Sequence, residues 1–219
     1  MEMINQITNS IVKHAKNGET IYSLAKKTGF AYSAVYKWVM VLRDYEVIDL
    51  IEMGNKSIIK INRNSIYKKF RELNNAVNVI EKDRIFWDII KKTRLKIRFI
   101  ENTAVVIWTQ GSYITGDFID KVYFLEGYNK DLPSFEEILK KYDIKYSEDK
   151  IVADERPFVY ITPKRNKFEI NRKNNLPVIP LNELLKWCKK LYLDNVLEHL
   201  DQMYHLNLKT KYSEIKTNI

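Results

Sequence analysis

The stretch SLAKKTGFAYSAVYKWVMVLRDYEVIDLIEMGNKSIIKI, residues 23–61, decides the expected fold of the first third of the chain. It opens with a short run of apolar residues at helical spacing that stops at Thr28-Gly29, and a longer run over residues 32–45 follows almost at once. The apolar period then falls from 3.6 to 2 over residues 47–53 and 57–61, which flank a Gly-Asn-Lys turn. We therefore expect two helices joined by a tight turn and followed by a β-hairpin.

Helical spacing also precedes and follows this stretch. Residues 3–16 carry apolar side chains one turn apart and end before Asn17-Gly18, so they predict a first helix, and Thr20 is placed to cap the second. Beyond the hairpin, a helix is expected from about residue 64 toward residue 81, with one apolar stripe formed by Phe70, Leu73, Val77 and Ile80. This helix either links two domains or pairs two chains.

Three positions carry the geometry of a helix-turn-helix. Such a motif needs a small residue where its helices pack, a glycine at the corner and a branched apolar residue to seal the angle, and Ala25, Gly29 and Val35 meet these needs. With the hairpin, residues 23–61 resemble the winged helix-turn-helix of bacterial and archaeal transcriptional regulators. The resemblance implies that residues 1–75 form a domain that binds double-stranded DNA.

One position departs from that family. Its members commonly have a left-handed glycine between the recognition helix and the first wing strand, where this chain has Tyr45-Glu46. A non-glycine residue in that conformation carries roughly 1 kcal/mol of strain, or the turn differs.

The helix over residues 32–45 is the expected recognition helix. Once its core stripe is removed, the outward side chains are Tyr32, Ser33, Tyr36, Lys37, Met40 and Arg43. Lys37 suits guanine acceptors, Ser33 and Tyr36 suit bases or phosphates, and Met40 suits a thymine methyl group.

Phosphate contacts are expected on both sides of this helix, from Lys26 and Lys27 and from the hairpin tip at Asn55 and Lys56. The alternative is that the same three helices and hairpin form a protein-binding winged helix, in which the lysines are only a solvated face.

The remainder of the chain mixes strand and helix patterns. Strands are expected at residues 95–99, 104–109, 122–126 and 158–162, and helices at residues 134–142, 181–191 and 194–205. Ser134 and Glu137 form a candidate capping box for the first of these helices. The fold class is therefore α+β, with a winged helix-turn-helix over 1–75, a connecting helix over 76–84 and a mixed α/β domain over 85–219.

The run VVIWTQGSYITGDFIDKVYFL, residues 105–125, faintly resembles a degenerate nucleotidyltransferase fold. In that family Gly-Ser binds phosphate, and two carboxylates one residue apart hold magnesium. Gly111-Ser112 and Asp120 match the pattern, but Val122 stands where the second carboxylate belongs. The metal clamp is incomplete, so an active transferase is not expected, although binding without turnover stays open.

Composition narrows the other function classes. The chain has 219 residues and a net charge of +9, and residues 1–75 hold 12 basic and 7 acidic side chains. A positive balance favours polyanionic partners. Cys188 is the single cysteine, and His14, His199 and His205 are scattered, so no metal site or cofactor is expected. A second basic group extends the DNA surface or decorates a hairpin: Lys164, Arg165, Lys167, Arg172 and Lys173.

These observations predict a non-enzymatic, cytoplasmic, sequence-specific DNA-binding transcriptional regulator that acts as a homodimer, with no membrane segment. The C-terminal domain is expected to dimerise, to sense a small-molecule effector or to bind a partner protein. Two alternatives remain: a winged-helix antitoxin-like protein that acts with a partner protein, and a nucleotidyltransferase-like enzyme.

Overall fold

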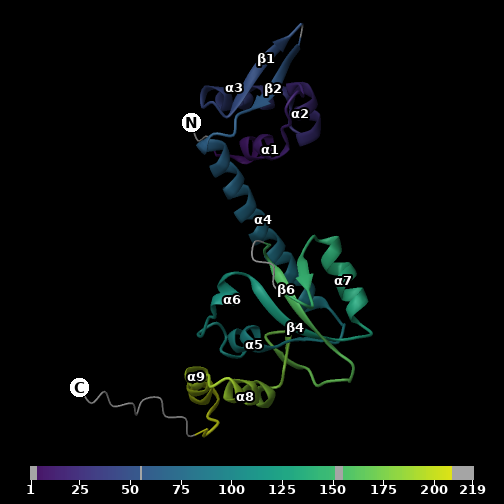
Figure 1. The fold of residues 1–219 in the computed structure, drawn as a ribbon, viewed down its shortest axis with the longest axis vertical. Helices are drawn as coiled ribbons and strands as arrows, with labels where there is room; N and C mark the ends of the chain where they lie inside the picture. The colour runs from purple at the N-terminus through teal and green to yellow at the C-terminus, as the bar shows by residue number, and fades with distance from the viewer. Residues whose placement is uncertain (1–3, 55, 151–154, 209–219) are drawn as a thin grey trace, which may run out of the picture. The chain divides into compact units, whose positions relative to one another are not determined.

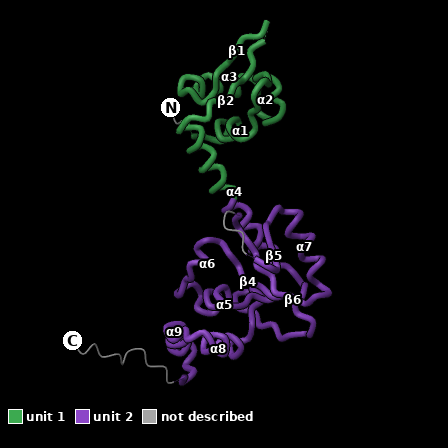
Figure 2. The backbone as a smooth tube through the Cα atoms, viewed as in Figure 1, with its two compact units in different colours: residues 1–78 green, residues 79–219 purple. Residues whose placement is uncertain are grey.

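A computed structural model describes residues 4–54, 56–150 and 155–208, and the chain divides into two compact units, residues 1–78 and 79–219 (Figure 2). Both units combine helices with a β-sheet (Figure 1), which confirms the mixed α+β class. Each unit is described by itself.

Unit 1 contains three short helices, a hairpin and the first part of a long helix. In chain order its elements are α1 (Gln6–His14), α2 (Ile21–Thr28), α3 (Tyr32–Asp44), β1 (Ile48–Met53), β2 (Lys56–Ile61) and the start of α4 (Ser65–Lys92). The ends of α2 follow from local chemistry, because Thr20 accepts a hydrogen bond from the Ser23 amide and Gly29 closes the helix with φ of 75°. Both ends match the sequence prediction.

The core of unit 1 lies where its three short helices meet the hairpin. Leu24, Val35 and Ile59 are fully buried in it, and the small Ala25 is nearly so. The hairpin pairs Ile48 with Ile61 at its base, and its second strand also bonds to the segment before α2 through the Ile59 amide and the Glu19 carbonyl. The hairpin is therefore held in place from both sides.

The helix α4 is longer than predicted. It spans 28 residues, and the expected end near residue 81 is wrong because Phe86 and Ile90 continue the apolar pattern into the core of unit 2. The expected connecting segment, residues 76–84, is the middle of this helix. Phe70 is buried in the core of unit 1, so it cannot belong to an exposed seam between two chains, whereas Val77 and Ile80 are exposed.

Unit 2 is built on a six-stranded mixed sheet in the order β5-β6-β4-β3-β8-β7. Its strands are β3 (Ile97–Phe99), β4 (Val122–Tyr128), β5 (Lys145–Ser147), β6 (Phe158–Lys164), β7 (Asn171–Lys173) and β8 (Leu176–Val178). Its helices after α4 are α5 (Glu101–Trp108), α6 (Gly116–Ile119), α7 (Leu132–Lys141), α8 (Leu181–Lys190) and α9 (Asp194–Tyr204). The strands β4, β5 and β6 are mutually parallel, whereas β3 runs antiparallel to β4.

Two local predictions for unit 2 are wrong. The strand expected at residues 104–109 is the helix α5, whose residues from Thr103 to Trp108 are all buried, so no exposed face gives the run a period. The capping box expected at Ser134 does not form, because α7 starts earlier, with Asp131 as its N-cap and Pro133 in its first turn.

Charged side chains lie inside the sheet of unit 2. Arg98 and Glu126, on the neighbouring strands β3 and β4, are both buried and form an ion pair. Arg98 also contacts Glu183 on α8 at 2.7 Å, and Lys164 contacts Glu126 at 3.1 Å. The network fixes α8 to the sheet, because each buried charge meets an opposite one.

Candidate nucleic-acid interface

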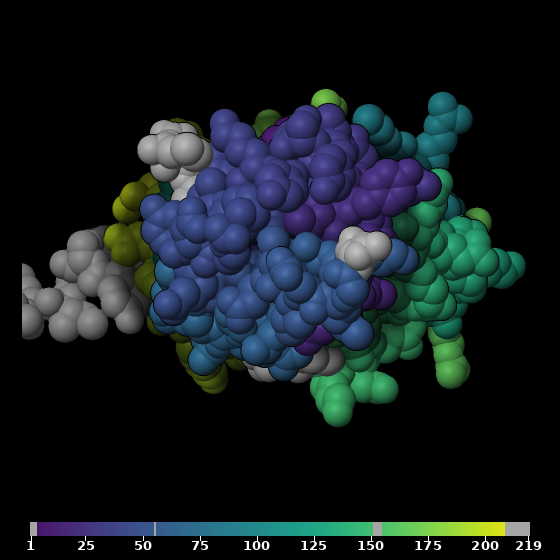
Figure 3. All heavy atoms as spheres, turned by 90° about the horizontal axis from the view of Figure 1, so that it is seen from above, coloured from purple at the N-terminus to yellow at the C-terminus, as the bar shows by residue number. Residues whose placement is uncertain are grey.

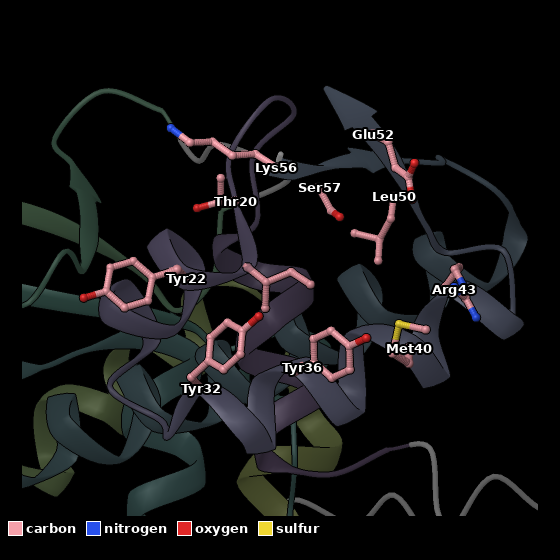
Figure 4. Close-up of a pocket in the computed structure, with 11 residues that line it drawn as sticks. Thr20, Tyr22, Tyr32, Tyr36, Met40, Arg43, Leu50, Glu52, Lys56 and Ser57 are labelled. Carbon is pink, nitrogen blue, oxygen red and sulfur yellow. The ribbon is translucent and has the colours of Figure 1, made fainter. Parts of the chain in front are cut away.

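A groove of about 630 Å³ lies in unit 1 between α3 and the hairpin (Figure 4). Its lining combines hydroxyl, aromatic and charged side chains: Thr20, Ile21, Tyr22, Tyr32, Tyr36, Met40, Arg43, Leu50, Glu52, Lys56 and Ser57. In the space-filling view, the side chains of residues around α2, α3 and the hairpin, coloured purple to blue, cover one face of unit 1 (Figure 3).

One row of α3 forms a wall of this groove. Tyr32, Tyr36, Met40 and Arg43 follow one another at intervals of four, four and three residues, which places them on a single helix face. The other wall comes from the hairpin, where Leu50 and Glu52 alternate along β1 and Ser57 lies opposite Glu52. Figure 4 shows the two rows facing each other across the gap.

The structure separates the predicted recognition residues into two sets. Ser33 and Lys37 are exposed on α3 but do not line the groove, whereas the tyrosines, Met40 and Arg43 do. Lys56 lines the groove from the hairpin. Asn55, predicted beside it, lies outside the described residues.

An exposed ladder of tyrosine rings runs along the groove. The ring centroids of Tyr22 and Tyr32 lie 6.5 Å apart and those of Tyr32 and Tyr36 lie 6.0 Å apart. The three residues are 44–60% exposed, so their neighbouring rings form one continuous aromatic surface, which is the kind of patch that marks an interaction site. The ammonium of Lys26 lies 4.9 Å from the centre of the Tyr22 ring, so this cation belongs to the same surface.

Sequence reasoning missed Tyr22, Thr20 and Glu52. The signal for Tyr22 was its spacing of four from Lys26, which puts both side chains on one face of α2. Thr20 and Glu52 gave no such signal, because the hairpin brings them to the groove through tertiary contacts, including the bridge between Thr20 and Ile58.

The predicted phosphate-binding lysines differ in whether they already form an ion pair within unit 1. The ammonium of Lys27 lies 3.1 Å from the Glu19 carboxylate and also donates to the His14 carbonyl, so its charge is occupied within unit 1. In the part of the chain that the structure describes, Lys26, Lys37 and Lys56 form no ion pair. Arg43 pairs with its exposed neighbour Asp44 at 3.5 Å.

The turn between α3 and β1 contains a residue in the left-handed conformation, Glu46, which is not a glycine. Glu46 has φ of 56°, its amide donates to the Arg43 carbonyl, and its own carbonyl accepts from the Asn64 side chain at 2.9 Å. These bonds hold a conformation that strains a side chain by about 1 kcal/mol. The turn thus keeps the geometry of a glycine turn in spite of its sequence.

The predicted phosphate-binding part of unit 2 is arranged differently from a transferase site. Gly111-Ser112 follow the helix α5, whereas the resemblance requires a strand. The Ser112 hydroxyl lies 2.6 Å from the Thr109 carbonyl, to which it can donate, and 2.7 Å from Nε2 of His199, whose role as donor or acceptor depends on its tautomer. Within the described ranges, no cluster of three or more His, Cys, Asp or Glu side chains is placed to hold a metal ion.

The second basic group is largely engaged within unit 2. Lys164 pairs with Glu126, Arg172 donates to the Asn175 carbonyl at 3.0 Å, and the Lys173 ammonium lies 5.2 Å from the centre of the Tyr204 ring.

Burial raises the pKa of the Cys188 thiol to about 12, so this cysteine stays protonated. None of the helices that the structure describes has the length and apolar content needed to cross a membrane.

Comparisons of the chain with protein-family models, with curated proteins and with solved structures found no match.

Proposed function

We propose that the chain is a sequence-specific DNA-binding transcriptional regulator that docks on duplex DNA through α3 and the β1–β2 hairpin. The observation that carries this proposal is the groove of unit 1, where a row of exposed tyrosines is flanked by lysines that no carboxylate of the described residues neutralises. Unpaired cations around hydrogen-bonding aromatic side chains suit a phosphate backbone better than a neutral protein surface.

In this proposal α3, the hairpin and α2 each contact a different part of the DNA. An α-helix fits the major groove of B-form DNA, so α3 presents Lys37 and Met40 toward base edges, while the Tyr36 hydroxyl meets the phosphate backbone. Lys56 of the hairpin contacts the phosphate backbone beside the major groove, and Lys26 of α2 contacts the backbone on the other side of that groove. The tyrosine hydroxyls donate to phosphate oxygens on the way.

A homodimer is part of the proposal. One module of this size buries only about 600 to 1,000 Å² on DNA, and two-fold pairing is the usual route to a specific affinity. Sedimentation of the full chain with and without a duplex measures the stoichiometry, for which two chains per duplex are expected. The proposed place of action is the cytoplasm.

The hairpin test uses two lysines on the same strand. Lys56 lines the groove, whereas Lys60 lies opposite Asp49, outside the groove lining. In anisotropy titrations on a fluorescent duplex, Lys56→Ala is expected to lower the slope of log K against log salt by about one, while Lys60→Ala leaves it unchanged. Equal slopes for the two variants would place the hairpin away from the DNA.

The helix test separates base reading from backbone contact. Lys37→Ala is expected to relax base preference in selection from a random duplex library, because it removes a partner for guanine. Tyr36→Phe is expected to weaken all duplexes alike by about threefold, through one lost hydrogen bond. Tyr45→Phe is the control, since Tyr45 is exposed but does not line the groove. Unchanged binding in both test variants would exclude this face.

A further inference from the structure

A second groove lies entirely in unit 2, with a volume of about 310 Å³. Its walls are mainly apolar and come from α4, α5 and the segment around α6, with Trp87, Val106, Ile114 and Phe118 among the lining residues. The volume equals that of about ten water molecules at roughly 30 Å³ each, so the groove has room for about ten non-hydrogen atoms.

The aromatic wall of this groove is preformed. The ring centroids of Trp87 and Phe118 lie 5.8 Å apart, and Phe118 also packs edge-on against Tyr123 at 5.6 Å. The Trp87 indole N–H donates to the Tyr123 hydroxyl at 3.3 Å, and that hydroxyl in turn bonds to Asp83. A ligand would meet a wall whose rings are already fixed, so it loses little affinity to ordering.

The described lining of the groove carries positive charge and no negative charge. Among the described residues that line the groove, Lys91 carries the single charge, and it forms no ion pair within the part of the chain that the structure describes. Gln110 adds an amide at the same rim. The C-terminus of α4 contributes a partial negative charge of about half a unit, which Lys91 and its neighbour Lys92 together exceed.

The apolar lining also reaches the surface. Ile114 is 55% exposed at the edge of the groove, so an apolar body seated there would cover a side chain that water now contacts. Charge and shape therefore indicate one ligand chemistry, an apolar body with a single negative group.

We propose that this groove binds a small amphipathic carboxylate of about ten non-hydrogen atoms, with its apolar body against Trp87 and Phe118 and its carboxylate at Lys91. This proposal does not depend on DNA binding by unit 1. The two therefore fail separately.

Octanoate is the probe, and octanamide is its uncharged counterpart of the same size. In nitrogen-15 NMR titrations of the full chain, octanoate is expected to shift the Trp87 indole signal with a Kd of about 1 mM or tighter. Trp87→Phe identifies that signal among the four tryptophans. Octanoate is expected to bind about three- to fivefold more tightly than octanamide at low salt, because only octanoate pairs with Lys91.

Two matched pairs of variants decide the outcome. Lys91→Gln is expected to remove the preference for octanoate, while Lys92→Gln, one residue away and outside the lining, retains it. Ile114→Glu is expected to weaken octanoate binding by at least about tenfold, because the new carboxylate repels the ligand and apolar contact is lost. Ile119→Glu, at an exposed position outside the lining, is expected to bind octanoate as the wild type does. No indole shift at 10 mM octanoate, or equal binding of both probes, or equal behaviour within either pair, overturns the proposal.

Discussion

Units 1 and 2 carry similar net charges, but unit 2 buries a network of opposite charges in its sheet, whereas unit 1 exposes around its groove three lysines that pair with no described carboxylate. Residues 1–78 hold a net charge of +5 and residues 79–219 one of +4. In unit 2 the sheet cation Arg98 is 6% exposed and bound to two carboxylates, and Lys164 completes the network. In unit 1 the described lysines Lys26, Lys37 and Lys56 form no ion pair with described residues. Net charge therefore says less about a partner than the neighbours of each cation do.

The largest effect is expected from the buried network. Arg98→Met leaves Glu126 buried with only Lys164 as its partner, so unit 2 is expected to lose about 3 kcal/mol of unfolding free energy. Denaturant unfolding measures this loss. Lys69→Ala, which breaks an exposed pair with Glu72, is the control and is expected to leave the unfolding free energy nearly unchanged. A similar loss of unfolding free energy in both variants would show that the buried network of unit 2 stabilises no more than an exposed pair of unit 1.

Adjacent lysines of α2 test the contrast within unit 1. Lys26→Ala is expected to weaken duplex binding about five- to tenfold at 0.1 M salt without changing stability, because its charge is free for a phosphate. Lys27→Ala is expected to weaken folding slightly through Glu19 and to leave the affinity nearly unchanged. Anisotropy and thermal unfolding measure the two effects. The reverse pattern would mean that the ion pair opens on DNA.

The turn at Glu46 gives a smaller effect. Glu46→Gly is expected to stabilise unit 1 by about 0.5 kcal/mol, since relief of left-handed strain exceeds the added freedom of the unfolded glycine. Glu46→Ala keeps the Cβ atom and serves as the control, with no gain expected. Denaturant midpoints compare the two variants. A gain in both would trace the effect to the lost charge.

The smallest effect is expected at Glu101 in unit 2. Burial raises the pKa of this carboxyl above its usual value, and the nearby carboxylates of Asp117 and Glu126 raise it further. The folded state therefore holds the proton more tightly, and stability falls as pH rises above about 4.5. Glu101→Gln is expected to stabilise unit 2 by about 0.3 kcal/mol at pH 7, a small gain because the side chain is only partly buried. Unfolding measured at pH 4 should show no gain. An equal gain at both pH values would exclude titration as the cause.

The sequence predicted unit 1 better than unit 2 for a physical reason. In unit 1 the three short helices are amphipathic, and α2 also begins at a capping Thr20 and ends at a left-handed Gly29, so period and caps agree there. In unit 2, residues 103–108 of α5 are all buried and show no period, and β5, β7 and β8 have three residues each. Elements of that kind are defined by their neighbours.

The candidate site was predictable on one side only. The helical row of Tyr32, Tyr36, Met40 and Arg43 follows from the spacing of α3. The opposite row depends on how the hairpin folds back against the segment at Thr20, which no local pattern encodes. The same limit applied to Lys27, whose ion pair with Glu19 forms between residues eight positions apart.

The salt dependence of duplex binding tests the account most directly. Four cations of each chain, Lys26, Lys37, Arg43 and Lys56, are assigned to the DNA surface, so log K is expected to fall against log salt with a slope of about −3 to −4 for each chain bound to the duplex. The measurement is an anisotropy titration on a random-sequence duplex between 50 and 300 mM potassium chloride. A slope near zero, or no binding at the lowest salt, would contradict a DNA-docking role for α3 and the hairpin.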